Sequence, residues 1–359
     1  MTHDSAALKV LILGGTGTIS ASCVRLAVAS GMRVTVLNRG TPHAGRELPP
    51  AVERLVGDVA DEKTLREAAR GRDLDAVVDF LSYDEHTAAR AVRAFAGTTG
   101  QYVHISSASI YTKPLRQIPL TESSPVGPNP ALPYATAKWR AEQTLVKAHD
   151  EEGFPVTIVR PSHTYDDASP VLPGGWSIID RIARGAEVPV PGDGTSLWTL
   201  THAEDFAQGL IGLVGNTRAR GEIFTITGSD VYTWDQIYTI VAEALGVAPQ
   251  LVHVPAEFYP LVAPDWFWSG EVAGDLGHSA VFDGTKIRRF VPGFAPRLTF
   301  GRAIHRILAW RSAHPDEAAP EPTTDAVIER IVGAYHAARE VFLASAGTTA
   351  GHTEEHAAS

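Results

Sequence analysis

The chain has 359 residues, of which 44% are hydrophobic and 20% are charged, as in ordinary globular proteins. Its formal net charge of −10 opposes binding to nucleic acid or anionic lipid, so we expect neither a nucleic-acid nor a membrane partner. The lone Cys23 cannot form an internal disulfide, and we find neither a signal-peptide pattern nor an apolar run of about 20 residues. These features favour a cytoplasmic location and a small-molecule substrate.

Short β-branched segments alternate with longer helical patterns over the first 160 residues. Strands are predicted at 8–13, 33–37, 53–56, 76–80, 101–106 and 155–160. Helices are predicted at 18–30, 62–70, 85–95 and 134–151. This alternation is typical of a parallel sheet covered by helices on both faces. We therefore expect an α/β fold, with a doubly wound parallel sheet of the Rossmann type forming a dinucleotide-binding domain over residues 1–160.

The pattern changes after residue 160, where proline, glycine and tryptophan become frequent and indicate a smaller substrate-binding lobe. We assign residues 161–200 and 228–344 to this lobe. The stretch 201–227 returns to the first domain, because its first part, 201–213, has the pattern of an amphipathic helix. Residues 345–359 carry too little apolar surface to offset their ordering entropy, so we predict a disordered tail there.

A glycine-rich turn, Gly-Gly-Thr-Gly-Thr-Ile-Ser at 14–20, joins the first predicted strand to the first predicted helix. Backbone N–H groups and a helix N-terminus at such a turn can face a pyrophosphate. A purely steric use of glycine is the alternative interpretation. The location between strand and helix favours cofactor binding. The cofactor-binding candidates here are Gly14, Thr16, Gly17, Thr18 and Ile19.

The end of the second predicted strand bears on the choice of cofactor. Asn38 and Arg39 stand where a carboxylate would normally accept the adenosine ribose hydroxyls. An amide does not repel a 2′-phosphate and a guanidinium can pair with one, although Arg39 is equally interpretable as a solvated loop residue. We expect NAD(P), with NADP slightly favoured over NAD. Asp58, after the third strand, either bonds the adenine or caps the next helix.

Tyr134 and Lys138 are four residues apart on one face of a helix that Pro133 opens. A nearby ammonium lowers the pKa of a phenol from its usual value of about 10 toward a range useful for proton transfer. Ser107, at the carboxyl edge of the sheet, is placed to hold the oxygen whose proton the phenol takes. Taken singly, these residues also fit an exposed helix pair and a turn-forming serine. Their order after the glycine turn favours catalysis.

Several segments together resemble one enzyme family. They are residues 14–19, His-Ile-Ser-Ser-Ala-Ser-Ile-Tyr at 104–111, Tyr-Ala-Thr-Ala-Lys at 134–138, Val-Arg-Pro at 159–161, and His202-x-x-Asp205. The chain resembles the extended short-chain dehydrogenases, the NAD-dependent epimerase/dehydratase family, over roughly residues 8–310. The resemblance implies a homodimer and a catalytic set of Ser107, Tyr134 and Lys138. It also implies cofactor contacts at Gly14, Gly17, Thr18, Ile19, Asp58, Val59, Leu81, Tyr134, Lys138, Pro161 and His163.

Departures from the family pattern narrow the substrate. Dehydratases of the family have an Asp-Glu pair where this chain has Ala108 and Ser109, so dehydration is disfavoured. Trp198 replaces an arginine that grips the substrate diphosphate, and a second arginine is missing ahead of Asp283. Each lost charge-assisted phosphate contact would cost about 1.5–3 kcal/mol. We therefore expect a neutral sugar, glycoside or cyclitol.

The substrate-binding candidates are Ser107, Ser109, His163, Trp176 and Trp198. His163 either bonds a substrate oxygen or is a structural histidine. Trp176, Trp198, Trp266 and Trp268, with Tyr259, either offer flat faces to a sugar ring or fill the core of the smaller lobe. The histidines have no compact ligand spacing, so we expect no metal.

The sequence leaves the net reaction open. If Tyr134 removes a hydroxyl proton as hydride leaves the same carbon, a ketone forms. A ketone that turns over in the pocket gives an epimerase, whereas one that departs gives a dehydrogenase or, in reverse, an NADPH-dependent carbonyl reductase of a secondary metabolite. The alternative from another class is a nonenzymatic regulator, either a dinucleotide sensor or an RNA-binding scaffold. The intact Ser107, Tyr134 and Lys138 and the acidic net charge argue against it.

Overall fold

The computed structural model describes residues 7–41 and 45–353. Within these residues the chain forms two compact units. The first unit takes its residues from 1–171, 197–232 and 278–318, and the second from 172–196, 233–277 and 319–359. The chain therefore passes between the units more than once.

A seven-stranded sheet forms the centre of the first unit. Its strands are β1 (Lys9–Leu13), β2 (Arg33–Asn38), β3 (Glu53–Val56), β4 (Ala76–Asp79), β5 (Tyr102–Ile105), β6 (Val156–Pro161) and β10 (Ile223–Ile226). Their order is β10-β6-β5-β4-β1-β2-β3, and neighbouring strands pair in parallel. The predicted doubly wound fold is confirmed. The strand order reverses beside β1, where folds of this class bind ligands at the carboxyl ends of the strands.

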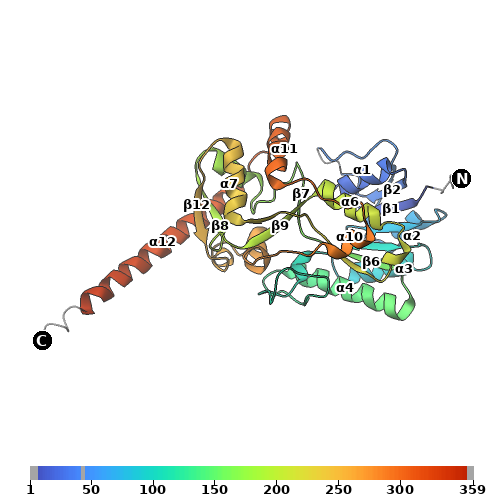
Figure 1. Ribbon diagram of the computed structural model, residues 1–359, viewed down its shortest axis with the longest axis horizontal. Helices are drawn as coiled ribbons and strands as arrows, with labels where there is room; N and C mark the ends of the chain where they lie inside the picture. The colour runs from blue at the N-terminus through green and yellow to red at the C-terminus, as the bar shows by residue number, and fades with distance from the viewer. Residues whose placement is uncertain (1–6, 42–44, 354–359) are drawn as a thin grey trace. The chain divides into compact units, whose positions relative to one another are not determined.

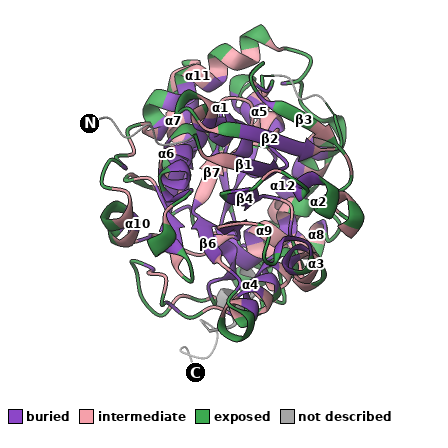
Figure 2. Cartoon of the chain, turned by 90° about the vertical axis from the view of Figure 1, so that its right-hand side faces the viewer, coloured by how far each residue is buried: buried purple, intermediate pink, exposed green. Residues whose placement is uncertain are grey.

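Helices cover both faces of this sheet (Figures 1 and 2). One layer holds α1 (Ser20–Ala29) and α6 (Ala203–Leu213), and the other holds α2 (Glu62–Ala69), α3 (Glu85–Phe95) and α4 (Pro133–Glu152). Successive side chains of a strand point to opposite faces. Val10 accordingly packs in the core beneath α1 and α6, whereas Leu11 packs in the core beneath the other three helices. The hydrophobic alternation along β1 therefore fixes the layers on both sides.

Local sequence signals set the ends of these helices. Asp84 accepts from the backbone N–H of Thr87 at the start of α3, and the two residues form a capping box. Pro133 opens α4 at a position where no backbone donor is needed. Gly153, with φ of 68°, ends α4 in the left-handed conformation that favours glycine. These signals make α4 a 20-residue helix with its N-terminus at the carboxyl edge of the sheet.

The first unit includes more of the chain than we expect from the sequence. A three-stranded sheet has the order β11-β9-β7, from β7 (His163–Tyr165), β9 (Leu197–His202) and β11 (Val231–Thr233). The segment 278–318, assigned above to the smaller lobe, lies in the first unit with α10 (Thr285–Phe290) and α11 (Phe300–Ala313). The reason is apolar burial: Ile287 and Phe294 join the same core as α1 and α6.

The second unit contains a two-stranded parallel sheet of β8 (Glu187–Pro191) and β12 (Gln250–Val254). Its helices are α5 (Trp176–Ala183), α7 (Trp234–Leu245), α8 (Phe258–Val262), α9 (Phe267–Glu271), the π-helical turn η3 (Val272–Leu276) and α12 (Pro322–Thr353). Arg181 of α5 donates to Asp325 and Glu329 at 2.9 and 2.6 Å, which ties α5 to α12.

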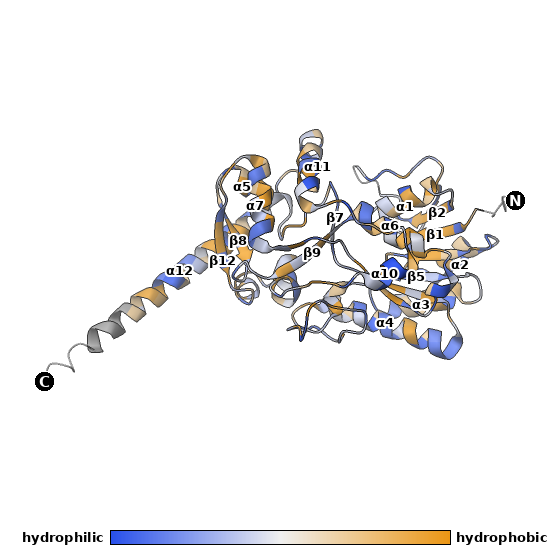
Figure 3. Ribbon diagram, in the orientation of Figure 1, coloured by the Kyte–Doolittle hydropathy of each residue, from blue (hydrophilic) through white to orange (hydrophobic). Residues whose placement is uncertain are grey.

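The structure differs from the prediction at the C-terminal end. α12 continues to Thr353, although we expect a disordered tail from residue 345. Alanines at 344 and 346 favour extension of a helix that is already nucleated, because propagation costs less than initiation. Residues 354–359 of the predicted tail lie outside the described residues. Hydrophilic and hydrophobic turns follow one another along α12 (Figure 3), and no helix in the described part of the chain is long and apolar enough to cross a membrane.

Candidate functional site

The glycine turn leaves β1 in a conformation that requires glycine. Gly14 and Gly15 have φ of 107° and 89°, in the left-handed region. A Cβ on Gly15 would stand 2.9 Å from Cγ1 of Val36, closer than real side chains approach. The N–H of Gly14 donates to the carbonyl of Leu37 at 2.9 Å. The turn is therefore held against the end of β2.

The N-terminus of α1 lacks the side-chain cap that α2 and α3 have. Ile19 stands at the N-cap and accepts no hydrogen bond through its side chain. Ser20 Oγ, one residue further on, accepts from the N–H of Gly17 at 2.8 Å. The N–H groups in the first turn of a helix need partners from outside it, and an anionic group is a favourable one. The glycine turn and the uncapped helix therefore fit the pyrophosphate of a dinucleotide.

Other cofactor-binding candidates gather at this turn. Asn38 Nδ2 donates to the carbonyl of Gly14 at 3.1 Å, and Asn38 Oδ1 accepts from the N–H of Gly40. The Leu81 side chain lies 3.5 Å from where a Cβ on Gly14 would stand. The structure thus brings Gly14, Asn38 and Leu81 together. Arg39, the next residue along, is exposed.

Asp58 is exposed and Val59 is half-buried just after β3. The Asp58 carboxylate accepts from the N–H of Ala60 at 2.9 Å. The helix that follows is capped by Asp61, which accepts from the N–H of Lys63. The suggestion that Asp58 caps this helix is therefore wrong, because the cap residue lies three positions later. The adenine contact stays a prediction.

Lys138 fixes α4 to the carboxyl edge of the sheet. Its ammonium donates to the carbonyls of Ser82 and Ile105, each at 2.8 Å, beyond β4 and at the end of β5. The side chain is only 2% exposed. Tyr134 precedes Lys138 by one helical turn, and Ser107 lies two residues beyond β5. The three predicted catalytic residues therefore share one edge of the sheet.

The charge on the Lys138 ammonium is set by its burial and by nearby carboxylates. Burial lowers the pKa of Lys138 from 10.5 to about 8, and the negative charges of Asp79, Glu142 and Asp84 oppose that shift. Asp79 is held by the N–H groups of Leu81 and Ser82 and by the hydroxyls of Ser82 and Tyr102. At neutral pH the ammonium is therefore largely charged although it is nearly dehydrated.

Tyr83 also belongs to this site, although it is not among the residues predicted from the sequence. Its ring centroid lies 4.5 Å from the Lys138 ammonium and 6.3 Å from the centroid of the Tyr134 ring. Tyr134 is 37% exposed, so a substrate can reach it. Its position in the sequence could have indicated this role, because Tyr83 follows β4 at the edge of the sheet where ligands bind. An aromatic face over a dehydrated ammonium favours its charged form.

Ser107 is paired with a second serine. Its hydroxyl lies 2.7 Å from the hydroxyl of Ser109 and accepts from the N–H of Ser109 at 3.1 Å. Ser107 caps a 3₁₀ turn, η1 (Ala108–Ile110), which packs against α4. Ser107 is half-buried and Ser109 is buried. The two substrate-binding candidates thus form one hydroxyl pair at a turn that packs against the helix carrying Tyr134.

Packing interactions dominate around the remaining substrate-binding candidates of the first unit. Trp198 is 2% exposed, and its ring makes an edge contact with His163 at 5.4 Å between centroids. His163 Nε2 bonds the carbonyl oxygen of Val171 at 3.0 Å. Pro161 is buried at the end of β6. These contacts favour the structural interpretation of His163 and the core interpretation of Trp198.

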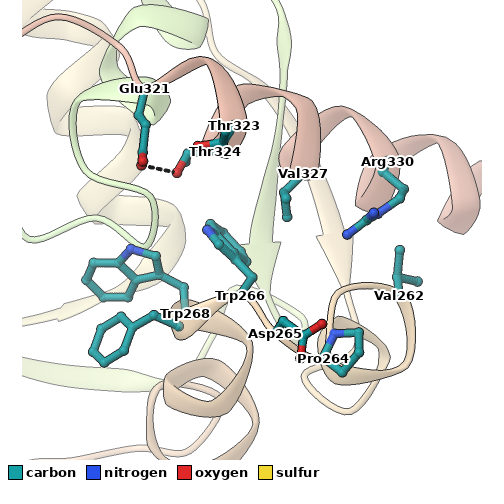
Figure 4. A pocket seen from close by; sticks show the side chains of 11 residues that line it. Val262, Pro264, Asp265, Trp266, Trp268, Glu321, Thr323, Thr324, Val327 and Arg330 are labelled. Atoms are coloured by element: carbon teal, nitrogen blue, oxygen red, sulfur yellow. Dashed lines mark hydrogen bonds between the residues drawn. The ribbon is translucent and has the colours of Figure 1, made fainter.

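The second unit holds a surface pocket of about 420 Å³ (Figure 4). Its lining combines aromatic, hydroxyl and charged side chains, from Val262, Pro264, Asp265, Trp266, Phe267, Trp268, Glu321, Thr323, Thr324, Val327 and Arg330. Tyr259 is fully buried in the core, and Trp176 is half-buried at the start of α5. Of the candidate aromatic residues, Trp266 and Trp268 therefore line an accessible surface. No cluster of three or more His, Cys, Asp or Glu side chains within 7–41 and 45–353 is arranged to hold a metal.

Comparison with known proteins gives a family match. The model of the NAD-dependent epimerase/dehydratase family matches residues 10–227. A 2′-dehydrokanamycin reductase from Streptomyces kanamyceticus is 28% identical over 302 residues, with 81% of each chain covered. The chloroplast stem-loop binding protein of 41 kDa b from Arabidopsis thaliana is also 28% identical, over 84% of this chain and 82% of its own.

Solved structures of similar fold include sugar-nucleotide enzymes. A dTDP-glucose 4,6-dehydratase from Streptomyces venezuelae with NAD bound has a TM-score of 0.69 at 22% identity, covering 85% of this chain and 97% of its own. A UDP-glucose 4-epimerase from Bifidobacterium longum in complex with NAD⁺ and UDP has a TM-score of 0.68 at 19% identity, covering 86% and 99%. At these identities the likeness is one of fold.

Proposed function

Since the chain belongs to the NAD-dependent epimerase/dehydratase family, we propose that it oxidises or reduces a hydroxyl-bearing carbon of a sugar-like substrate that carries no nucleotide diphosphate. One observation carries the proposal. The Lys138 ammonium is anchored between the ends of β4 and β5, one turn from the accessible Tyr134 and beside the segment that holds Ser107.

Each residue has a defined task. When bound, the nicotinamide of NAD(P) accepts or donates the hydride. The glycine turn and the N-terminus of α1 hold the pyrophosphate, and Ser107 holds the reacting oxygen. Tyr134 takes the hydroxyl proton in oxidation and returns it in reduction. Lys138 stabilises the phenolate by its charge and holds the ribose.

Two replacements support a substrate without a diphosphate. Trp198 occupies the place of a phosphate-binding arginine, and its ring is buried against His163 rather than free for an anion. The acid-base pair used for dehydration is replaced by Ala108 and Ser109, and Ser109 is engaged with Ser107. The net charge of −10 also suits a neutral or cationic substrate better than an anionic one.

Net reduction of a ketone is favoured over epimerisation. The relative from S. kanamyceticus, matched over 81% of both chains, is named as a reductase of a dehydro compound. Asn38 and the exposed Arg39 suit NADPH slightly better than NADH. The proposal includes a homodimer and a cytoplasmic location. Light scattering of the purified protein tests whether it is a dimer.

The rival is a nonenzymatic stem-loop binding role, which the name of the A. thaliana relative brings into view. The acidic net charge opposes binding to a phosphate backbone. A buried ammonium beside buried carboxylates also costs desolvation energy, and such arrangements are concentrated at catalytic sites. We therefore rank the enzyme first.

The test is a substrate screen with NADPH and with NADH. Keto sugars and keto glycosides without phosphate form one panel, and UDP- and dTDP-linked sugars form the matched panel. We expect loss of reduced-nicotinamide absorbance, in a one-to-one ratio with product, in the first panel only. Conversion of a nucleotide sugar without net cofactor consumption would contradict the proposal, as would RNA binding with no turnover in either panel.

A further inference from the structure

Arg46 lies after β2, and its guanidinium contacts the glycine turn. Its Nη2 donates to Ser169 Oγ at 2.6 Å and lies 3.4 Å from Thr18 Oγ1. Thr18 is a residue of the glycine turn, and Ser169 lies in the loop that follows β7. Three segments distant in the sequence therefore meet at one guanidinium.

Asp166 fixes the orientation of this guanidinium. Its two carboxylate oxygens accept from Nε and Nη2 of Arg46 at 2.8 and 2.9 Å. Asp166 is itself held by the backbone N–H groups of Ala168 and Ser169. Only 14% of the Arg46 side chain and 10% of the Asp166 side chain are exposed. The guanidinium is thus held by two hydrogen bonds to one carboxylate at a site with little access to solvent.

The arrangement leaves part of the guanidinium available. A guanidinium has five N–H donors in one plane, and Nε and Nη2 make the contacts described above. No described residue accepts a hydrogen bond from the two donors of Nη1. Phosphate oxygens are preferred partners of such donors, and they bind a planar fork better than a point charge. A dinucleotide held at Thr18 would bring two phosphates to this place.

From this geometry we propose that Arg46 is a cofactor-binding residue that donates to the pyrophosphate of NAD(P), and that Asp166 positions it. The inference rests on the dinucleotide-binding part of the proposed function. It separates the roles of two arginines. Arg46 recognises the pyrophosphate, which NAD and NADP share, whereas Arg39 is the candidate for the 2′-phosphate, which only NADP has.

The test measures equilibrium dissociation constants for Arg46→Ala, Arg46→Lys, Arg39→Ala and the unchanged protein. The ligands are NADH, NADPH, ADP-ribose and adenosine. Binding of the first three is measured by fluorescence or calorimetry, and binding of adenosine is measured by competition. We expect Arg46→Ala to weaken NADH, NADPH and ADP-ribose by a similar factor of about 10–100. Adenosine, which has no phosphate, should change less than about twofold. Arg46→Lys should recover part of the loss.

The matched variant Arg39→Ala should affect NADPH alone or none of the four ligands. A loss confined to NADPH in Arg46→Ala would overturn the inference, because it would assign Arg46 to the 2′-phosphate. Unchanged binding of ADP-ribose would also overturn it. If Arg46→Ala fails to fold, as thermal unfolding would show, Arg46→Lys still decides: binding of ADP-ribose equal to that of the unchanged protein sinks the inference.

The two proposals fail in different ways. An unchanged protein that binds no dinucleotide at all would refute both the proposed function and the role of Arg46. An unchanged protein that binds NAD(P), together with variants of Arg46 that bind it equally well, would refute only the role of Arg46.

Discussion

The edge of the seven-stranded sheet and the pocket of the second unit use their side chains in opposite ways. At the sheet edge, Lys138 and Glu142 are nearly inaccessible and each has fixed partners. In the pocket, Trp266 and Trp268 are half-buried and Phe267 is exposed. Proton transfer needs charges that are dehydrated and held in place. Aromatic side chains on an open surface can be substituted without disturbing those charges. The contrast indicates which substitutions should have large effects.

Glu142→Gln should have the largest effect on stability. Glu142 and Arg160 form a bidentate pair at 2.7 and 3.0 Å, and both side chains are almost fully buried. Removing one charge leaves the other buried without compensation, which costs on the order of 3 kcal/mol. Chemical denaturation measures the change.

The control for this prediction is Glu151→Gln on the same helix. Glu151 pairs with Lys147 at 3.8 Å, and both side chains are mostly exposed. Exposed pairs contribute less than about 1 kcal/mol. Equal effects of the two substitutions would remove the distinction between the buried edge and the surface.

The pH dependence of reduction should report Lys138. Its pKa is lowered to about 8 in the folded protein, so its charge is present below pH 8 and is lost above it. Without that charge the phenol of Tyr134 is a poorer proton donor. We expect kcat/KM to fall by about tenfold per pH unit above pH 8. A profile that stays flat from pH 7 to 10 would show that this ammonium does not control the reaction.

Substitution of Tyr83 should have a smaller effect on the same profile. Its aromatic face lies 4.5 Å from the Lys138 ammonium and favours the charged form. Tyr83→Leu removes that face and should move the alkaline limb downward by about one pH unit or less. Tyr83→Phe keeps the ring and serves as the matched control. A shift of equal size in both variants would assign the effect to the hydroxyl instead.

Trp266→Ala should have the smallest effect on cofactor affinity. Trp266 lines the pocket of the second unit, whereas the glycine turn and Lys138 lie in the first unit. We expect the dissociation constant of NADPH to change less than about twofold, as for other sites that share no partners. Weakening beyond fivefold, by fluorescence titration, would show that the two regions are coupled.

Periodicity and turn chemistry made the main sheet predictable. Residues 53–56 and 85–95 were predicted with the observed bounds, and for the helix 85–95 the Asp84 cap leaves little choice of starting residue. The Tyr134 and Lys138 spacing likewise fixes a common helix face without any tertiary information. In these segments local signals and tertiary packing agree, which is the condition for prediction from sequence.

Partnerships between distant segments could not be predicted in this way. Arg46 and Asp166 are 120 residues apart, and neither belongs to a recognisable motif. Tyr83 reaches Lys138 only because β4 and α4 converge at the sheet edge. The segment 278–318 was assigned to the wrong unit because apolar residues such as Phe294 do not reveal which core they enter.

The most direct test of the account is Tyr134→Phe, which removes one hydroxyl from the accessible ring beside Lys138. The account predicts that kcat for ketone reduction falls by at least about a hundredfold to a thousandfold, while the dissociation constant of NADPH changes less than about twofold. Retention of full turnover in this variant, with NADPH still bound, would contradict it.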